Sequence, residues 1–100
     1  MNAMIKQAQK MQEDMAALQE ELDNREYDIS AGGGVVGVKI NGKKEILSID
    51  IKPEIVDPDD IETLSDILVA AVNEAIKRVE DTNSAEMSKI TGSVGFPGML

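Results

Sequence analysis

The sequence predicts an α+β fold in which a helix, three antiparallel strands and a second, longer helix follow one another. Two stretches, 2–24 and 58–91, carry apolar residues at helical spacing, and the region between them, 26–51, has strand-like alternation around an Asn-Gly turn signal. One hundred residues suffice for one domain with one hydrophobic core, so we treat 1–100 as a single unit. We expect its last residues, 92–100, to form a flexible tail because they are rich in glycine.

The first helix is indicated by six apolar residues that recur at alternating steps of four and three. This spacing is typical of a coiled-coil seam, and residues 1–31 contain neither glycine nor proline. The stripe consists of Met4, Ala8, Met11, Met15, Leu18 and Leu22.

The predicted sheet has strands at 26–30, 35–40 and 44–51, with a flexible glycine-rich connection between the first two. Asn41-Gly42 is the strongest short hairpin signal, since both residue types tolerate the positive φ of a type I′ turn. A two-residue turn here would place Val36 opposite Leu47, and we expect the face that carries Val38 and Ile49 to be the core.

The second helix begins, by prediction, at an Asp57 N-cap with Pro58 in its first turn. Its apolar stripe resumes after a polar stretch at 81–84, and no helix breaker occurs before Gly92, so we expect one continuous helix. The stripe consists of Ile61, Leu64, Leu68, Ala71, Ala75, Val79, Met87 and Ile90.

The helices are too long for the sheet. Strands of this size make a sheet about 17–27 Å long, whereas the helices would span about 30 and 50 Å. The apolar residues that overhang need a partner surface, and a second copy of the chain is the commonest solution. We therefore predict a homodimer with projecting helices, whose interface residues are Met4, Ala8, Met11, Met15 and Leu18.

The composition excludes several classes of function. Cysteine and histidine are absent, which removes disulfides, thiol nucleophiles, Cys/His zinc sites and histidine acid–base catalysis. Two aromatic residues cannot form a base-stacking platform. The glycines at 32–34 lack the Lys-Ser/Thr of a phosphate loop, and the acids at 57–62 fit helix capping better than calcium binding. We expect no enzyme activity, metal, cofactor or small-molecule substrate.

Charge and hydropathy restrict the partners. The net charge is −9, which taken alone argues against a simple polyanion binder. The acids are concentrated in 13–28 and 54–81, whereas residues 1–12 carry Lys6 and Lys10 and no acid. No apolar run is long enough for a membrane span and no signal peptide is recognisable, so we expect a cytoplasmic protein. One function left open is an acidic protein-interaction adaptor that grips a partner helix in a methionine-lined cleft, without binding DNA.

Several short motifs follow one another in fixed order along the chain. They are Met-Ile-Lys-Gln-Ala-Gln-Lys-Met-Gln at 4–12, the glycine-rich entry to the hairpin at 36–42, the segment from Asp57-Pro58 to Ala75, and Phe96-Pro97-Gly98-Met99. Together these motifs resemble the YbaB/EbfC family of bacterial nucleoid-associated proteins, and residues 4–12 are similar to the family's opening helix. The resemblance covers nearly all of the chain.

The resemblance implies a dimer with an α-β-β-β-α order and helices that project like tweezers. It also implies a nucleoid-associated protein that binds double-stranded DNA with little or modest sequence preference and influences nucleoid organisation and gene expression. The family's DNA contacts are attributed to polar and basic positions on the two projecting helices. The matching residues here are Lys6, Gln7, Lys10, Lys77, Arg78 and Lys89.

Overall fold

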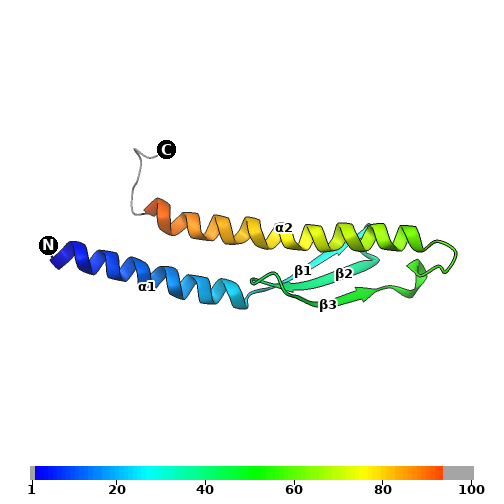
Figure 1. The fold of residues 1–100 in the computed structure, drawn as a ribbon, viewed down its shortest axis with the longest axis horizontal. Coiled ribbons are helices and arrows are strands. Elements are labelled where there is room, and N and C mark those ends of the chain that lie inside the picture. Colours follow the sequence, from blue (N-terminus) through cyan, green and yellow to red (C-terminus); the bar gives the residue numbers. More distant parts are fainter. Residues whose placement is uncertain (1, 94–100) are drawn as a thin grey trace.

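The structure is a computed structural model that describes residues 2–93. It contains α1 (Asn2–Asn24), β1 (Glu26–Ala31), β2 (Val36–Asn41), β3 (Ile46–Ile51) and α2 (Ile61–Ser93), with short 3₁₀ turns η1 (Gly32–Gly34) and η2 (Pro53–Ile55). The three strands form one antiparallel sheet in the order β1-β2-β3 (Figure 1). The predicted α+β fold class is confirmed.

One hydrophobic core lies between α2 and the sheet. Helix α2 packs across β1 and β2, and alanines at the centre of its buried face let its backbone approach the strands closely. The buried residues of this core are Ile29, Val36, Val38, Ile40, Ala71, Ala75 and Val79.

Both helices extend beyond the sheet, as their lengths predict. The chain measures 70 × 26 × 15 Å, with the long axis along α2. Helix α2 runs over the sheet and continues past it beside α1, whose N-terminal end reaches further than the end of α2 (Figure 1). The N-terminal end of α1 and the C-terminal end of α2 therefore point the same way.

The hairpin between β2 and β3 differs from the predicted type I′ turn. The residue with positive φ is Lys44, at 67°, whereas Gly42 does not have a positive φ. The Asn41 side-chain oxygen accepts hydrogen bonds from the N–H groups of Lys43 (2.9 Å) and Glu45 (3.0 Å) and so stabilises a longer loop. A bulge follows, and Val36 pairs with Ile51 instead of Leu47.

The predicted burial of the third strand is wrong. Val36 and Val38 are in the core, but Leu47 is 46% exposed and Ile49 is 44% exposed. The physical reason is the position of α2, which covers β1 and β2 and leaves β3 outside. The apolar alternation of β3 indicates a face that needs cover, and residues 2–93 do not fully supply that cover.

The start of α2 also differs from prediction. Asp57 closes a turn before the helix, since its carboxylate accepts the N–H of Asp59 (2.9 Å). The residue that caps the helix is Asp60, which accepts hydrogen bonds from the N–H (3.3 Å) and the hydroxyl (2.7 Å) of Thr63. The helix is continuous and includes residues 92 and 93 of the predicted tail. The rest of that tail, 94–100, lies outside the described residues.

Candidate nucleic-acid interface

The part of the molecule that extends beyond the sheet is a pair of helices, which we call the arm: α1 together with residues 82–93 of α2. Along α1, Met11, Met15 and Leu18 are half-buried and Leu22 is fully buried, while the remaining residues of this apolar stripe are exposed. This half-buried face packs against α2. The helices of the arm are therefore joined by an apolar seam within one chain.

The predicted dimer residues fall into two groups. Met11, Met15 and Leu18 belong to the seam of the arm and are partly covered within the chain. Met4 and Ala8 lie nearer the free end of α1, where α1 extends past α2, and both are exposed.

Polar contacts at the base of the arm hold it to the sheet. Arg25 lies 2.8 Å from the Glu21 carboxylate and 3.6 Å from the Glu86 carboxylate of α2. The hydrogen bond to Glu21, together with the negative charges of both carboxylates, raises the pKa of the Arg25 guanidinium above its usual value. The Asn83 amide donates to the carbonyl oxygen of Gly42 at 3.2 Å. These contacts fix the direction in which the arm leaves the sheet.

The free end of α1 carries the least compensated positive charge on the arm. Lys6 and Lys10 are exposed, and neither has a salt-bridge partner among residues 2–93. A spacing of four residues places both side chains on one face of the helix, and the exposed amide of Gln7 lies beside them in the sequence. This end of the arm can accept a phosphate without first breaking an ion pair.

A second basic pair lies on α2 above the sheet. Lys77 and Arg78 are exposed and fall between Ala75 and Val79, which are buried against the strands. Neither cation has a salt-bridge partner within the described part of the chain. They are therefore free to bind an anion, but they lie on the body of the molecule and not on the arm.

Lys89 is on the arm but is already paired. Its ammonium group lies 3.3 Å from the Glu86 carboxylate, the same carboxylate that contacts Arg25. The Lys89 side chain is 73% exposed, so this ion pair is weak and can open. Lys89 is a poorer anion ligand than Lys6 or Lys10.

The structure therefore brings the predicted DNA-contacting residues into two patches. At a rise of 1.5 Å per residue, the part of α1 from Lys10 to the base of the arm and the part of α2 from there to Lys77 together span about 30 Å. The sequence between them along α1 is acidic and includes Glu13, Asp14, Glu20 and Glu21. A polyanion would be attracted to the two patches and repelled by the stretch between them.

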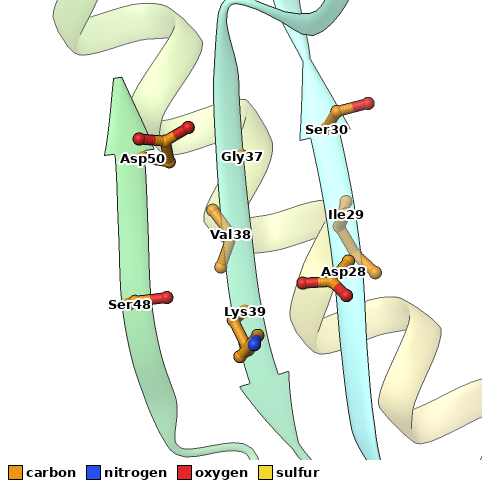
Figure 2. Close-up of a pocket in the computed structure, with 8 residues that line it drawn as sticks. All are labelled: Asp28, Ile29, Ser30, Gly37, Val38, Lys39, Ser48 and Asp50. Atoms are coloured by element: carbon orange, nitrogen blue, oxygen red, sulfur yellow. The ribbon is translucent and has the colours of Figure 1, made fainter. Parts of the chain in front are cut away.

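A shallow hollow on the outer face of the sheet is a second candidate site. It has a volume of about 320 Å³, and one of its lining residues is Gly37, which has no side chain to fill it. Figure 2 shows its polar side chains on the side of the sheet away from α2; they are Asp28, Ser30, Lys39, Ser48 and Asp50. The alternation of the strands places these residues on one face, and this alternation is a signal that the sequence itself carries.

This hollow is chemically unsuited to phosphate. It carries two carboxylates and one lysine, and Lys39 also lies 3.9 Å from the Glu26 carboxylate. Within residues 2–93, no group of three acidic side chains is placed to hold a metal ion. Neither helix, over the same residues, has an apolar stretch long enough to cross a membrane.

Comparison with known proteins identifies the family. Residues 1–94 match the model of the YbaB/EbfC DNA-binding family. The chain belongs to this family. A nucleoid-associated protein of Alkaliphilus metalliredigens is 54% identical over 100 residues, which cover all of this chain and 88% of that protein. A nucleoid-associated protein of Pelotomaculum thermopropionicum is also 54% identical over 100 residues, which cover all of this chain and 95% of that protein.

A solved structure supports the fold. The crystal structure of an uncharacterized protein from Helicobacter pylori superposes with a TM-score of 0.74 at 24% sequence identity, covering 89% of this chain and 94% of that one. At this identity the likeness concerns the fold alone. The resemblance of the motifs to the YbaB/EbfC family, read from the sequence, is thus confirmed over nearly the whole chain.

Proposed function

We propose that this YbaB/EbfC protein is a nucleoid-associated protein that binds duplex DNA through the exposed cations of its projecting helices. The observation that carries the proposal is the family match over residues 1–94. It assigns a DNA-binding family to a chain whose arm ends in Lys6 and Lys10, which have no salt-bridge partner among residues 2–93. Lys77 and Arg78 form the second contact, Gln7 adds a hydrogen bond to phosphate or sugar, and Lys89 contributes when its ion pair with Glu86 opens.

The mode of binding follows from the small number of cations. Each phosphate contact by a lysine or arginine releases counterions, so four or five contacts give a moderate salt dependence and an affinity of about 10⁻⁴–10⁻⁶ M. The cations contact the backbone of the duplex, which carries no sequence information. Binding is therefore nearly independent of sequence, which suits a protein that influences nucleoid organisation and gene expression broadly.

The proposed working unit is a homodimer. Two linked arms raise the apparent affinity of weak single contacts, because the second contact becomes intramolecular. Exposed Met4 and Ala8 can meet a second copy directly, whereas Met11, Met15 and Leu18 can contribute only the part of their surface that α2 leaves open. The proposed role is one of binding. The chain has neither histidine nor cysteine, so histidine acid–base catalysis and a thiol nucleophile are not available to it.

The test is a gel-shift or anisotropy titration of labelled duplexes of unrelated sequence over a range of salt concentrations, with unlabelled competitor. We expect all duplexes to bind alike and binding to weaken steadily as salt rises. Absence of any shift at low salt, with retention of a protein partner in a pull-down, would favour the adaptor with a methionine-lined cleft. Strong preference for one duplex would contradict backbone-only contact.

A further inference from the structure

Methionine is confined to the arm in the described part of the chain. The sequence has six methionines, of which Met1 and Met99 lie outside residues 2–93. The core between α2 and the sheet contains none, since its buried side chains are those of isoleucine, valine and alanine. The chain also lacks cysteine, histidine and tryptophan, so the thioether sulfur of methionine is its most easily oxidised side-chain group. The methionines of the arm are Met4, Met11, Met15 and Met87.

Three of these side chains lie where a change in polarity has a structural effect. Met11 and Met15 are half-buried on the face of α1 that packs against α2. Met87 is half-buried on α2, one turn beyond Asn83, whose amide contacts Gly42 where the loop after β2 meets the end of α1. All three are partly open to solvent, so a small oxidant has access to them while the arm stays folded.

Met4 differs from these three methionines in its surroundings. It is 72% exposed and lies near the free end of α1. A sulfoxide at this position meets water, whereas a sulfoxide in the seam places a strongly polar group between two helices. Oxidation of Met4 therefore leaves the arm unchanged, and oxidation of Met11, Met15 or Met87 loosens it.

We propose that Met11, Met15 and Met87 are sites of reversible oxidation by hydroperoxides, and that their sulfoxides release α1 from α2. In the reaction with hydrogen peroxide, a lone pair of the methionine sulfur forms a bond to one peroxide oxygen, and the O–O bond breaks. The leaving hydroxide takes the proton from the transferred oxygen and becomes water. The sulfur is oxidised by two electrons and the peroxide is reduced, and methionine sulfoxide reductases reverse the change.

The free end of α1 loses its support when the seam opens. Helices in proteins depend on tertiary packing more than on intrinsic propensity, so a released α1 frays from its N-terminal end. Lys6 and Lys10 lie at that end, and a mobile helix must be ordered again before both can contact phosphate. DNA binding therefore weakens, while the core under α2 keeps the sheet folded. The effect on DNA rests on the proposed function, whereas the opening of the arm does not.

The first test treats the wild type with hydrogen peroxide, removes the peroxide with catalase, and locates the sulfoxides by peptide mass spectrometry. We expect oxidation at Met11, Met15 and Met87 as well as at Met4. The thermal midpoint followed by circular dichroism should fall by about 4–8 °C. The dissociation constant for duplex DNA should rise roughly threefold or more, because α1 must be ordered on binding. Methionine sulfoxide reductases of both stereospecificities should restore both values.

Variants show which methionines are responsible. Met11→Leu/Met15→Leu/Met87→Leu conserves volume, cannot form a sulfoxide in the seam, and should keep its untreated midpoint and DNA affinity after peroxide. Met4→Leu is the matched control and should respond to peroxide like the wild type. Met15→Gln places a polar side chain of similar length in the seam and should lower the midpoint without any peroxide.

Loss of DNA binding in the peroxide-treated triple leucine variant, to the same extent as in the wild type, would contradict the proposal. So would an unchanged midpoint in a wild type that is oxidised at all of Met11, Met15 and Met87, or complete oxidation of Met4 while these three stay intact. A protein that loosens on oxidation but binds no duplex before treatment would refute the proposed function and leave the oxidation sites standing.

Discussion

Gly42 lies where the loop after β2 touches the end of α1. Its N–H donates to the carbonyl oxygen of Arg25 at 3.0 Å, and a Cβ placed on it would overlap the carbonyl group of Leu22. The position therefore requires glycine because two backbones meet, although the φ of Gly42 is not positive. The turn signal at Asn41-Gly42 identifies this residue as special, but the reason lies 20 residues earlier in the chain and cannot be seen in the local sequence.

We predict that Gly42→Ala lowers the free energy of unfolding by about 1–3 kcal/mol, because the added methyl group forces the loop away from α1. Chemical denaturation monitored by circular dichroism measures the change. Gly37→Ala is the control, since a Cβ there meets only the Asp50 side chain at an ordinary contact distance of 3.9 Å. Equal stability of the two variants would show that the contact with Leu22 does not constrain the loop.

At the level of single side chains, Asp60 is predicted to stabilise the start of α2. Asp60→Ala removes the two hydrogen bonds to Thr63 and should cost about 1 kcal/mol in the free energy of unfolding. Asp59→Ala removes the same charge from the neighbouring exposed residue and should leave thermal stability almost unchanged. If Asp59→Ala has the larger effect, the capping residue has been misassigned.

Among the elements, the two helices could be predicted well because their apolar periodicity is local and uninterrupted. The glycine-rich segment, read as a flexible connection, instead forms the 3₁₀ turn η1 with positive φ at Gly32, Gly33 and Gly34. The register of β3 could not be predicted, since it depends on hydrogen bonds to the Asn41 side chain and on a bulge. The exposure of β3 depends on where α2 crosses the sheet, which no local pattern specifies.

The apolar seam of the arm is predicted to hold α1 against α2. Met15→Asp places a carboxylate on the half-buried face between the helices, close to an acidic part of α1, and should cost about 1–3 kcal/mol. Thermal denaturation would show a lower midpoint and a less cooperative loss of helix. Gln12→Asp, on the same helix but at an exposed position, should not move the midpoint. If both variants melt like the wild type, the helices are not held together by this face.

At the scale of the whole molecule, a net charge of −9 is compatible with DNA binding because the charges are unevenly placed. The cation-bearing end of α1 projects from the sheet, and the acids lie along the rest of the arm and at the start of α2. The sequence could locate these blocks, and the family resemblance could name the residues. Only the fold shows that Lys6 and Lys10 lie on the arm, while Lys77 and Arg78 lie above the sheet.

The most direct test of DNA binding by the arm is the salt dependence of binding for Lys6→Ala/Lys10→Ala, compared with Lys39→Ala/Lys52→Ala. Both variants lose two positive charges, but Lys39 and Lys52 lie on and next to the sheet. If the free end of α1 contacts phosphate, the arm variant should bind all duplexes more weakly, and its slope of log K against log salt concentration should fall by about two units for each arm that contacts the duplex. The sheet variant should keep the wild-type slope. Equal loss of binding in the two variants would show that only overall charge matters, and would contradict DNA binding by the arm.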